Sequence, residues 1–220
     1  MPLFTPQTEW IPPEEFPDLS KYKEIAIDLE TKDPDLIKMG SGSVIGNGHV
    51  TGIAVAVEGW SGYYPIAHEG GGNMDFTRVI SWFRDVMRTN ATKIFHNAMY
   101  DMSWIITLGI PEINGRVVDT MIATAIVDEN RRRYDLNSCT REYIGKGKDE
   151  SVLYATAKEW GVDPKAEMYK LPAMYVGSYA EKDAAITLEL WNYLKQEIMN
   201  QDLEAIFKLE TDLFPCLVAM

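Results

Sequence analysis

The sequence has few of the residues that disulfides and soft-metal sites require. Its 220 residues include only two cysteines, Cys139 and Cys216, and three scattered histidines without ligand spacing. Neither a zinc site nor a disulfide framework is therefore indicated. No apolar run approaches the roughly 18 residues of a membrane span, and the N-terminal segment lacks the pattern of a signal peptide. We expect a soluble, cytoplasmic protein with no membrane partner.

Positive charge is also scarce. The chain has 21 Lys and Arg against 33 Asp and Glu, which gives a formal net charge of -12. This balance argues against a wide basic surface that grips duplex phosphates. Bound metal ions can reverse the electric field locally where carboxylates cluster. The net charge therefore does not exclude a polyanionic ligand.

The first half of the chain predicts a sheet. The first twenty residues hold five of the eleven prolines and predict an extended lead-in segment. Residues 24–30, EIAIDLE, predict a strand, and residues 49–59 and 61–67 predict a hairpin that continues from it. Residues 32–48 contain Pro34 and four glycines, which predicts a mobile loop.

Strands and helices then alternate, and the second half is mostly helical. The first helix, over residues 74–90, has an apolar stripe at helical spacing formed by Phe76, Val79, Ile80, Phe83, Val86 and Met87. The later predicted elements are a strand at 92–97, a helix at 98–110, a strand leading into a helix at 115–129, and a long helix at 178–200. The pattern predicts an α/β domain with a mixed five-stranded sheet, an antiparallel meander followed by parallel strands.

Two acids stand at alternate positions in the first predicted strand. Asp28 and Glu30 point to one face, while Ile25, Ile27 and Leu29 point to the other. Two carboxylates about 5 Å apart at an effective dielectric near 20 repel by roughly 3 kcal/mol, a penalty that a bound cation would turn into attraction. The simpler alternative is a strand that ends at the surface with both acids solvated.

Two further pairs have helical spacing. Asn97 and Asp101 lie four residues apart at a predicted helix start, where a helix cap and an ordinary first-turn acid are the alternatives. Tyr179 and Asp183 lie one turn apart on the long helix, among Ala180, Ala184 and Ala185. These small neighbours permit close packing, and the alternative is a Tyr at a helix edge with the acid exposed.

Together, D-x-E on an early strand, N-x-x-x-D on a middle helix and Y-x-x-x-D on a late helix resemble the three motifs of the DEDDy exonucleases, which have the ribonuclease H-like fold. The chain is most similar to the proofreading domain of family A DNA polymerases. The supporting stretches are DLET, VVDTMIATAIVDEN, YDLNSCTREYIG and YAEKDAAITLELW.

The resemblance implies a domain organisation. Residues 1–20 would be the lead-in and residues 21–203 the exonuclease domain. Residues 204–220 would begin a helical connection to a polymerase domain that is absent or separate. The chain is then either a fragment or a free-standing exonuclease.

The resemblance also implies a chemistry, the hydrolysis of terminal phosphodiesters at DNA 3′ ends. Asp28, Glu30, Asp101 and Asp183 would hold two Mg²⁺ or Mn²⁺ ions, with Asp28 as the bridge between them. Tyr179, paired with Glu30, would orient the attacking water. Single-stranded or frayed ends would be preferred, because a terminal base must leave the duplex to reach such a site.

Further residues are expected to contact the substrate. Thr31 would meet the terminal nucleotide, and Asn97 would steady Asp101 or contact the substrate. Tyr100 and Trp104 are candidate stacking surfaces. Arg131, in the run NRRR, is a candidate phosphate ligand, with a solvated basic turn as the alternative.

Two rival functions remain. Exoribonucleases similar to ribonuclease D share the three motifs, and the sequence cannot easily show discrimination at the 2′-hydroxyl. A catalytically silent module that binds strands or docks a replication partner is the second rival, and the presence of all four acids weighs against it.

Overall fold

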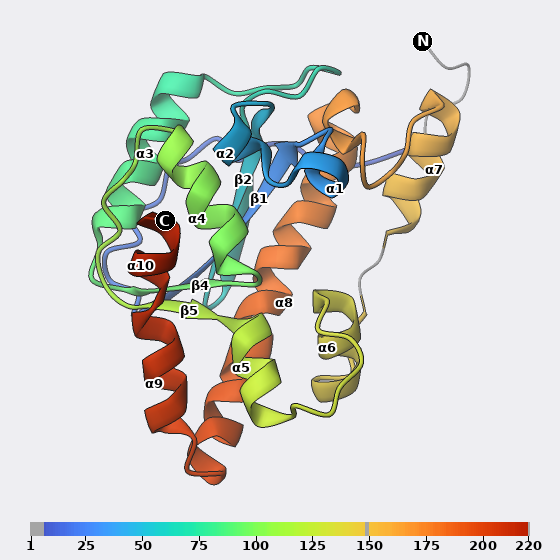
Figure 1. Ribbon diagram of the computed structural model, residues 1–220. Helices are drawn as coiled ribbons and strands as arrows, with labels where there is room; N and C mark the ends of the chain where they lie inside the picture. The colour runs from blue at the N-terminus through green and yellow to red at the C-terminus, as the bar shows by residue number, and fades with distance from the viewer. Residues whose placement is uncertain (1–6, 148–149, 220) are drawn as a thin grey trace.

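A computed structural model describes residues 7–147 and 150–219 (Figure 1). Its centre is one five-stranded sheet in the order β3-β2-β1-β4-β5. β1 pairs antiparallel with β2 and β2 with β3, whereas β1 pairs parallel with β4 and β4 with β5. The predicted mixed sheet is confirmed. The strands are β1 Glu24–Lys32, β2 His49–Val57, β3 Trp60–Pro65, β4 Thr92–Phe95 and β5 Val117–Asp119.

Helices cover both faces of the sheet. One apolar core joins a sheet face to α3, α4 and α10, and the other joins the opposite face to α5, α6, α7, α8 and α9. Figure 1 shows α8 running along the sheet on the side away from α3 and α4. The helices are α1 Leu36–Met39, α2 Gly42–Ile45, α3 Phe76–Arg88, α4 Ala98–Thr107, α5 Thr120–Val127, α6 Leu136–Tyr143, α7 Ser151–Trp160, the 3-10 turn η1 Met168–Lys170, α8 Ala173–Asn200, α9 Glu204–Asp212 and α10 Phe214–Ala219.

The two faces of the sheet differ in side-chain size. Ile25, Ile27 and Leu29 of β1 are buried in the core that includes α3 and α4. The face toward α8 carries small residues instead, Ala26 on β1 and Ala54 and Ala56 on β2, and α8 meets them with its own alanines Ala180 and Ala184. Because alanine occupies little volume, the helix lies close to the sheet. Side chains of α8 can therefore reach the acids of β1.

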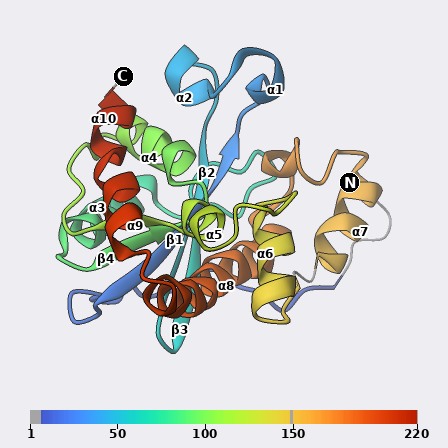
Figure 2. The ribbon, with the colours of Figure 1, turned by 60° about the horizontal axis from the view of Figure 1, so that its bottom comes forward.

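The segment after β1, residues 32–48, was predicted as a mobile loop and contains two short helices that the prediction did not include. It forms the one-turn helices α1 and α2, which stand beyond the ends of β1 and β2 (Figure 2). The Asp33 carboxylate accepts the Gly42 N–H at 3.1 Å, and the Ser43 hydroxyl bonds that of Ser103 on α4 at 2.6 Å. Such side-chain bonds order a Gly-rich segment that has no apolar periodicity.

Three further predictions needed correction in detail. β1 continues to Lys32, beyond the predicted end at Glu30, because β2 pairs with Thr31 and Lys32 as well. Phe76, assigned to the buried stripe, is 50% exposed at the first position of α3. The long helix starts at Ala173, five residues before the predicted start, directly after Pro172, whose φ suits a helix entry.

Residues 7–20 form neither helix nor strand, yet they pack on the domain. The Trp10 indole N–H donates to Glu181 on α8 at 2.9 Å. The ring also fills the space over Gly177, where an added Cβ would lie 2.1 Å from it. Phe16 stacks on Tyr64 of β3 with ring centroids 5.4 Å apart. The extended segment is thus part of the folded core.

No helix within residues 7–147 and 150–219 combines the length and the apolar character that crossing a membrane requires.

Candidate active site

The site is built where β4 ends and β1 continues. β4 pairs with β1 only as far as Ala26, so the N–H groups farther along that edge of β1 have no strand beside them. α4 takes the place of the strand, and the Asp101 carboxylate accepts the Leu29 N–H at 3.2 Å. Asp101 is 3% exposed. The chain thus delivers a buried carboxylate from α4 to the strand that carries Asp28 and Glu30.

A second buried acid, Asp119, fixes the start of α4. Its carboxylate accepts the N–H groups of Asn97 at 3.0 Å, Ala98 at 2.8 Å and Met121 at 2.8 Å. One side chain therefore caps α4 and α5 together. Burial raises the Asp119 pKa, and these N–H groups oppose the rise. Sequence reasoning missed this residue, although an Asp directly before a helix at the carboxyl end of a parallel strand was a usable signal.

α8 brings Tyr179 and Asp183 to the same place. Asp183 is 3% exposed, so the alternative of a solvated acid on this helix is wrong. The pKa of the Tyr179 hydroxyl is raised far above its ordinary value, first by burial and then by the charges of Asp183, Glu30 and Asp28. The phenol therefore keeps its proton beside these carboxylates.

The acids of the three segments act on one another electrostatically. The Asp101 pKa is raised well above its ordinary value by burial and then by the charge of Asp28, with smaller contributions from Asp119 and Glu30. Asp28 and Glu30 thus influence Asp101 on one side and Tyr179 on the other. Both are partly exposed, so the group opens to solvent. The motif acids of β1, α4 and α8 and the Tyr179 phenol thus lie in one place.

Two of the predicted substrate contacts, Thr31 and Tyr100, lie next to site acids in the chain and contact each other. The Thr31 hydroxyl lies 2.7 Å from the Tyr100 hydroxyl, which in turn donates to Asp33 at 3.1 Å. Thr31 follows a register irregularity in β1 directly after Glu30. Trp104, proposed as a stacking surface, is only 1% exposed, and that prediction is wrong because the ring belongs to the core.

Asn97 and Arg131 are placed differently. Asn97 is exposed, has a left-handed backbone (φ 72°) and makes no side-chain cap bond to α4. The Arg131 guanidinium is 2.6 Å from Glu142 and 4.8 Å from the Tyr143 ring centroid, with 6% of the side chain exposed. The structure ties Arg131 to α6 by these contacts and does not bring it into the acidic group.

The acidic group fits hard divalent cations by its donor chemistry. Its ligands are carboxylate oxygens, and Asp28 links the acids of β1 to Asp101 by charge. In the part of the chain that the structure describes, no three Asp, Glu, His or Cys side chains already stand close enough to hold one ion. A divalent cation bound among these carboxylates would relieve their mutual repulsion through its own charge.

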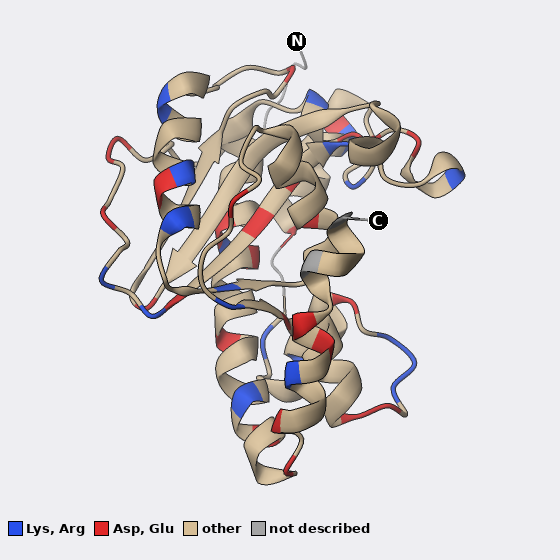
Figure 3. Cartoon of the chain, turned by 60° about the vertical axis from the view of Figure 1, so that its left-hand side comes forward, with Lys and Arg blue, Asp and Glu red and all other residues tan. Residues whose placement is uncertain are grey.

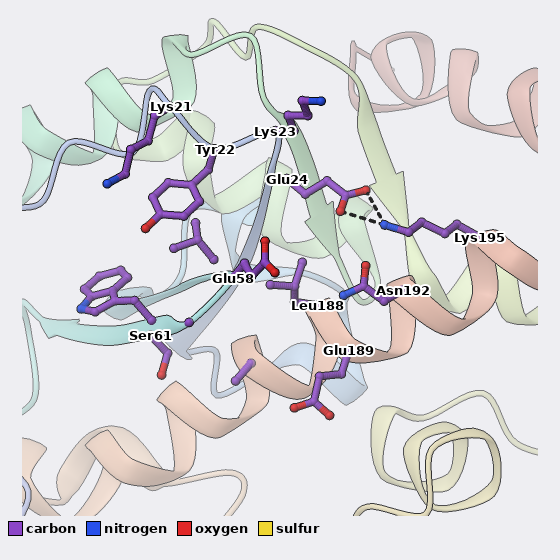
Figure 4. A pocket seen from close by; sticks show the side chains of 14 residues that line it. Lys21, Tyr22, Lys23, Glu24, Glu58, Ser61, Leu188, Glu189, Asn192 and Lys195 are labelled. Carbon is purple, nitrogen blue, oxygen red and sulfur yellow. Dashed lines mark hydrogen bonds and ion pairs between the residues drawn. The ribbon is translucent and has the colours of Figure 1, made fainter.

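Neither a group of basic residues nor a large cavity marks the site. Figure 3 shows Lys and Arg alternating with Asp and Glu along most of the chain, with one short basic run in a loop. A cavity of about 940 Å³ lies at the opposite end of β1, lined by Lys21, Glu24 and Lys195 among others (Figure 4). None of the predicted site residues is among the residues that line it.

Comparison with known proteins identifies the family of the chain. The model of a family described as 3′-5′ exonuclease matches residues 7–199. The DNA-directed DNA polymerase of Pseudomonas phage M6 is 36% identical over 226 residues, covering 100% of this chain and 34% of the polymerase. The chain thus spans about a third of the length of the curated relatives it matches.

Solved structures share the fold. Brucella melitensis NrnC with bound Mg²⁺ aligns with a TM-score of 0.62 at 15% identity, over 92% of this chain and 86% of NrnC. Escherichia coli RNase D, described as an exoribonuclease, aligns with a TM-score of 0.61 at 17% identity, over 91% of this chain and 46% of RNase D. The fold is thus ribonuclease H-like, and the chain belongs to the 3′-5′ exonuclease family of the family A DNA polymerases.

Proposed function

We propose that this domain removes nucleotides one at a time from single-stranded or frayed DNA 3′ ends and releases nucleoside 5′-monophosphates. The observation that carries the proposal is the meeting of Asp28, Glu30, Asp101, Asp183 and Tyr179 from three separate segments. Four acids with a protonated phenol beside them form a DEDDy set.

Two Mg²⁺ or Mn²⁺ ions would be held by Asp28, Glu30, Asp101 and Asp183. When bound, such ions make water a nucleophile near neutral pH and stabilise charge on the leaving 3′ oxygen. The Mg²⁺ bound by NrnC, which has the same fold, supports the choice of ion. The net charge of -12 makes this field necessary, because the substrate is itself a polyanion.

The chain's own groups position the reactants. Tyr179 keeps its proton, so its hydroxyl can donate to the attacking oxygen, with Glu30 as a neighbouring acceptor. Thr31 and Tyr100, which are bonded to each other beside Glu30, would meet the terminal nucleotide, and the exposed Asn97 would contact the strand. Arg131 is the weakest of the proposed contacts, because Glu142 and Tyr143 already engage it.

DNA is the proposed substrate because the 36% identical relative is a DNA polymerase. The likeness to RNase D at 17% identity concerns the fold and leaves the exoribonuclease as the alternative. A demand for unpaired ends would make the enzyme a proofreader, since mispaired ends fray more readily. We propose a polymerase domain as its partner, with residues 204–220, which include α9, as the start of the connection.

A labelled strand tests the proposal. Wild-type protein and an Asp28→Ala, Glu30→Ala double variant are incubated with 5′-labelled single-stranded DNA, with Mn²⁺ or with EDTA. We expect a ladder of shortened products from the wild type with Mn²⁺ only. The variant should fold with equal or higher melting temperature, because repulsion between the two carboxylates is relieved.

The same assay separates the rivals. Faster shortening of a matched RNA strand would favour the exoribonuclease. Binding of the DNA strand without any shortening would favour the silent module, and cleavage that persists in the double variant would mean that the site is misassigned.

A further inference from the structure

Lys165 is a cation in direct contact with the proposed site. It lies on the turn between α7 and η1, and its ammonium donates to the Tyr179 hydroxyl at 3.3 Å. The same nitrogen lies 4.9 Å from the centroid of the Tyr179 ring, within the range of a cation–π contact. This segment contributed no residue to the three motifs.

The backbone on each side of Lys165 is fixed by one acid. The Asp163 carboxylate accepts the N–H groups of Lys165 and Ala166, both at 2.8 Å. The Asp163 N–H donates to Glu167 at 3.0 Å. This side-chain turn gives a polar, Pro-containing stretch a defined shape. The base of the Lys165 side chain is therefore held in place.

The tip of the side chain is also held. The Lys165 ammonium lies 2.5 Å from the Glu150 carboxylate, which stands just before α7. With 48% of its side chain exposed, Lys165 is no core lysine, and its charge incurs no large cost of burial. Glu150 and Tyr179 accept two of the three N–H donors of the ammonium.

The contact has a consequence for the phenol. A tyrosine hydroxyl has one hydrogen to donate, and its oxygen also accepts. Because Lys165 donates to that oxygen, the phenolic hydrogen must point elsewhere. The charges that act on Tyr179 belong to Asp183, Glu30 and Asp28, so the hydroxyl donates into the acidic group. Donation by the ammonium also polarises the O–H bond, which makes the phenol a stronger donor.

We propose that Lys165 is a positioning residue that directs the Tyr179 hydroxyl toward the attacking water. The inference rests on the proposed exonuclease function. This role differs from phosphate binding. A Lys that only binds a phosphate of the strand would change the affinity for the substrate, and would do so whether or not Tyr179 is present. Lys165 acts through Tyr179, so its effect falls on turnover and disappears when the phenol is removed.

A double-mutant cycle tests this relation. Lys165→Met keeps an unbranched stem against the Tyr179 ring and removes the ammonium. It is made alone, and together with Tyr179→Phe, and cleavage of single-stranded DNA is measured with Mn²⁺. We expect Lys165→Met to lower kcat about tenfold with KM within about twofold, since misplacing a reacting group costs this much or more. In the Tyr179→Phe background the same change should alter kcat less than twofold.

Three further variants serve as controls for the double-mutant cycle. Lys158→Met removes the same charge from the hollow that Lys165 also lines, and should leave kcat unchanged. Lys165→Arg, which retains a donor, should restore most of the rate. Glu150→Gln leaves Lys165 in place but weakens its anchor, and should lower kcat about threefold, again only where Tyr179 is present. If Lys165→Met proved unfolded in a thermal melt, Glu150→Gln would decide.

The possible results distinguish failure of the Lys165 proposal from failure of the exonuclease function. An equal fall in kcat in both Tyr179 backgrounds, a rise in KM with kcat intact, or no effect of Lys165→Met would each overturn the proposal while leaving the exonuclease function standing. A wild-type protein that cleaves nothing would overturn the exonuclease function itself, and the positioning role with it.

Discussion

The two ends of β1 meet the same helix in opposite ways. At its first residue the strand presents Glu24 to α8, where Lys195 donates to both carboxylate oxygens at 3.1 and 2.9 Å (Figure 4). The Trp191 indole N–H donates to the same group at 2.9 Å. Nearer the N-terminus of α8 the helix carries the buried acid Asp183 instead, whose charge acts on Tyr179 together with those of Glu30 and Asp28 of β1.

This difference separates an acid paired with a lysine from the acids of the proposed site. At the Glu24 end a cation cancels the charge, and the pair contributes modestly to stability. At the other end the charges of Asp28 and Glu30 act on Asp101 and, with that of Asp183, on Tyr179, which also accepts a hydrogen bond from the Lys165 ammonium. Repulsion among these acids lowers the stability of the folded state, and a bound cation would relieve it. The amino-acid composition does not distinguish the two ends of β1, because the acids of both are counted together in the net charge.

Neutralising Asp183 should give the largest effect. With Asp183→Asn, cleavage of a labelled single strand is expected to fall at least about a thousandfold, because one member of a set that acts as a unit is lost. The melting temperature should stay equal or rise, since a buried charge beside other acids is removed. A variant that keeps its cleavage rate, or melts far below the wild type, would show that Asp183 is a structural acid like Glu24.

The acid end also contains a buried base that should make it sensitive to low pH. His68 is 3% exposed and bonds the Tyr63 hydroxyl at 2.6 Å, and burial lowers the His68 pKa from 6.5 to about 4. The folded state holds the ring neutral. Its stabilising contribution is thus complete above pH 6.5 and is lost as pH falls toward 4, by up to about 3 kcal/mol.

Urea unfolding between pH 7.5 and 4.5 measures this contribution. Because many carboxylates titrate in the same interval, the wild type is compared with His68→Gln, which cannot titrate. The difference in unfolding free energy between the two proteins should shrink as pH falls. Parallel curves would mean that His68 does not control stability at this end of the sheet.

The sequence predicted what depends on local periodicity. The strand alternation of β1 placed Ile25, Ile27 and Leu29 in one core, and the alanines of α8 indicated the close approach to the sheet. The mixed five-stranded topology followed from the order of elements. Tyr179 and Asp183, one helical turn apart, were predicted to share a face of α8, and Asp183 is buried on that helix.

What the sequence did not predict depends on contacts between distant segments. α1 and α2 are ordered by Asp33 and by a bond from Ser43 to Ser103 on α4, sixty residues away. In the sequence Asp119 has the position of an ordinary helix cap. In the structure its carboxylate accepts N–H groups at the starts of two helices, α4 and α5. Lys165 stands in a polar turn without a pattern, and only the folded chain brings it to Tyr179.

Glu24→Gln is the matched control for Asp183→Asn, and its effect should be the smallest. It neutralises an acid that faces the same helix, but one that Lys195 already pairs, with about a third of each side chain exposed. Because partly exposed pairs contribute little, the free energy of unfolding should fall by about 1 kcal/mol or less, measured by urea titration. Cleavage should be unchanged, since the pair lies at the far end of β1 from Asp28 and Glu30. A loss of cleavage comparable to that of Asp183→Asn would mean that the acids of this strand work as one continuous set, and the contrast between its ends would fail.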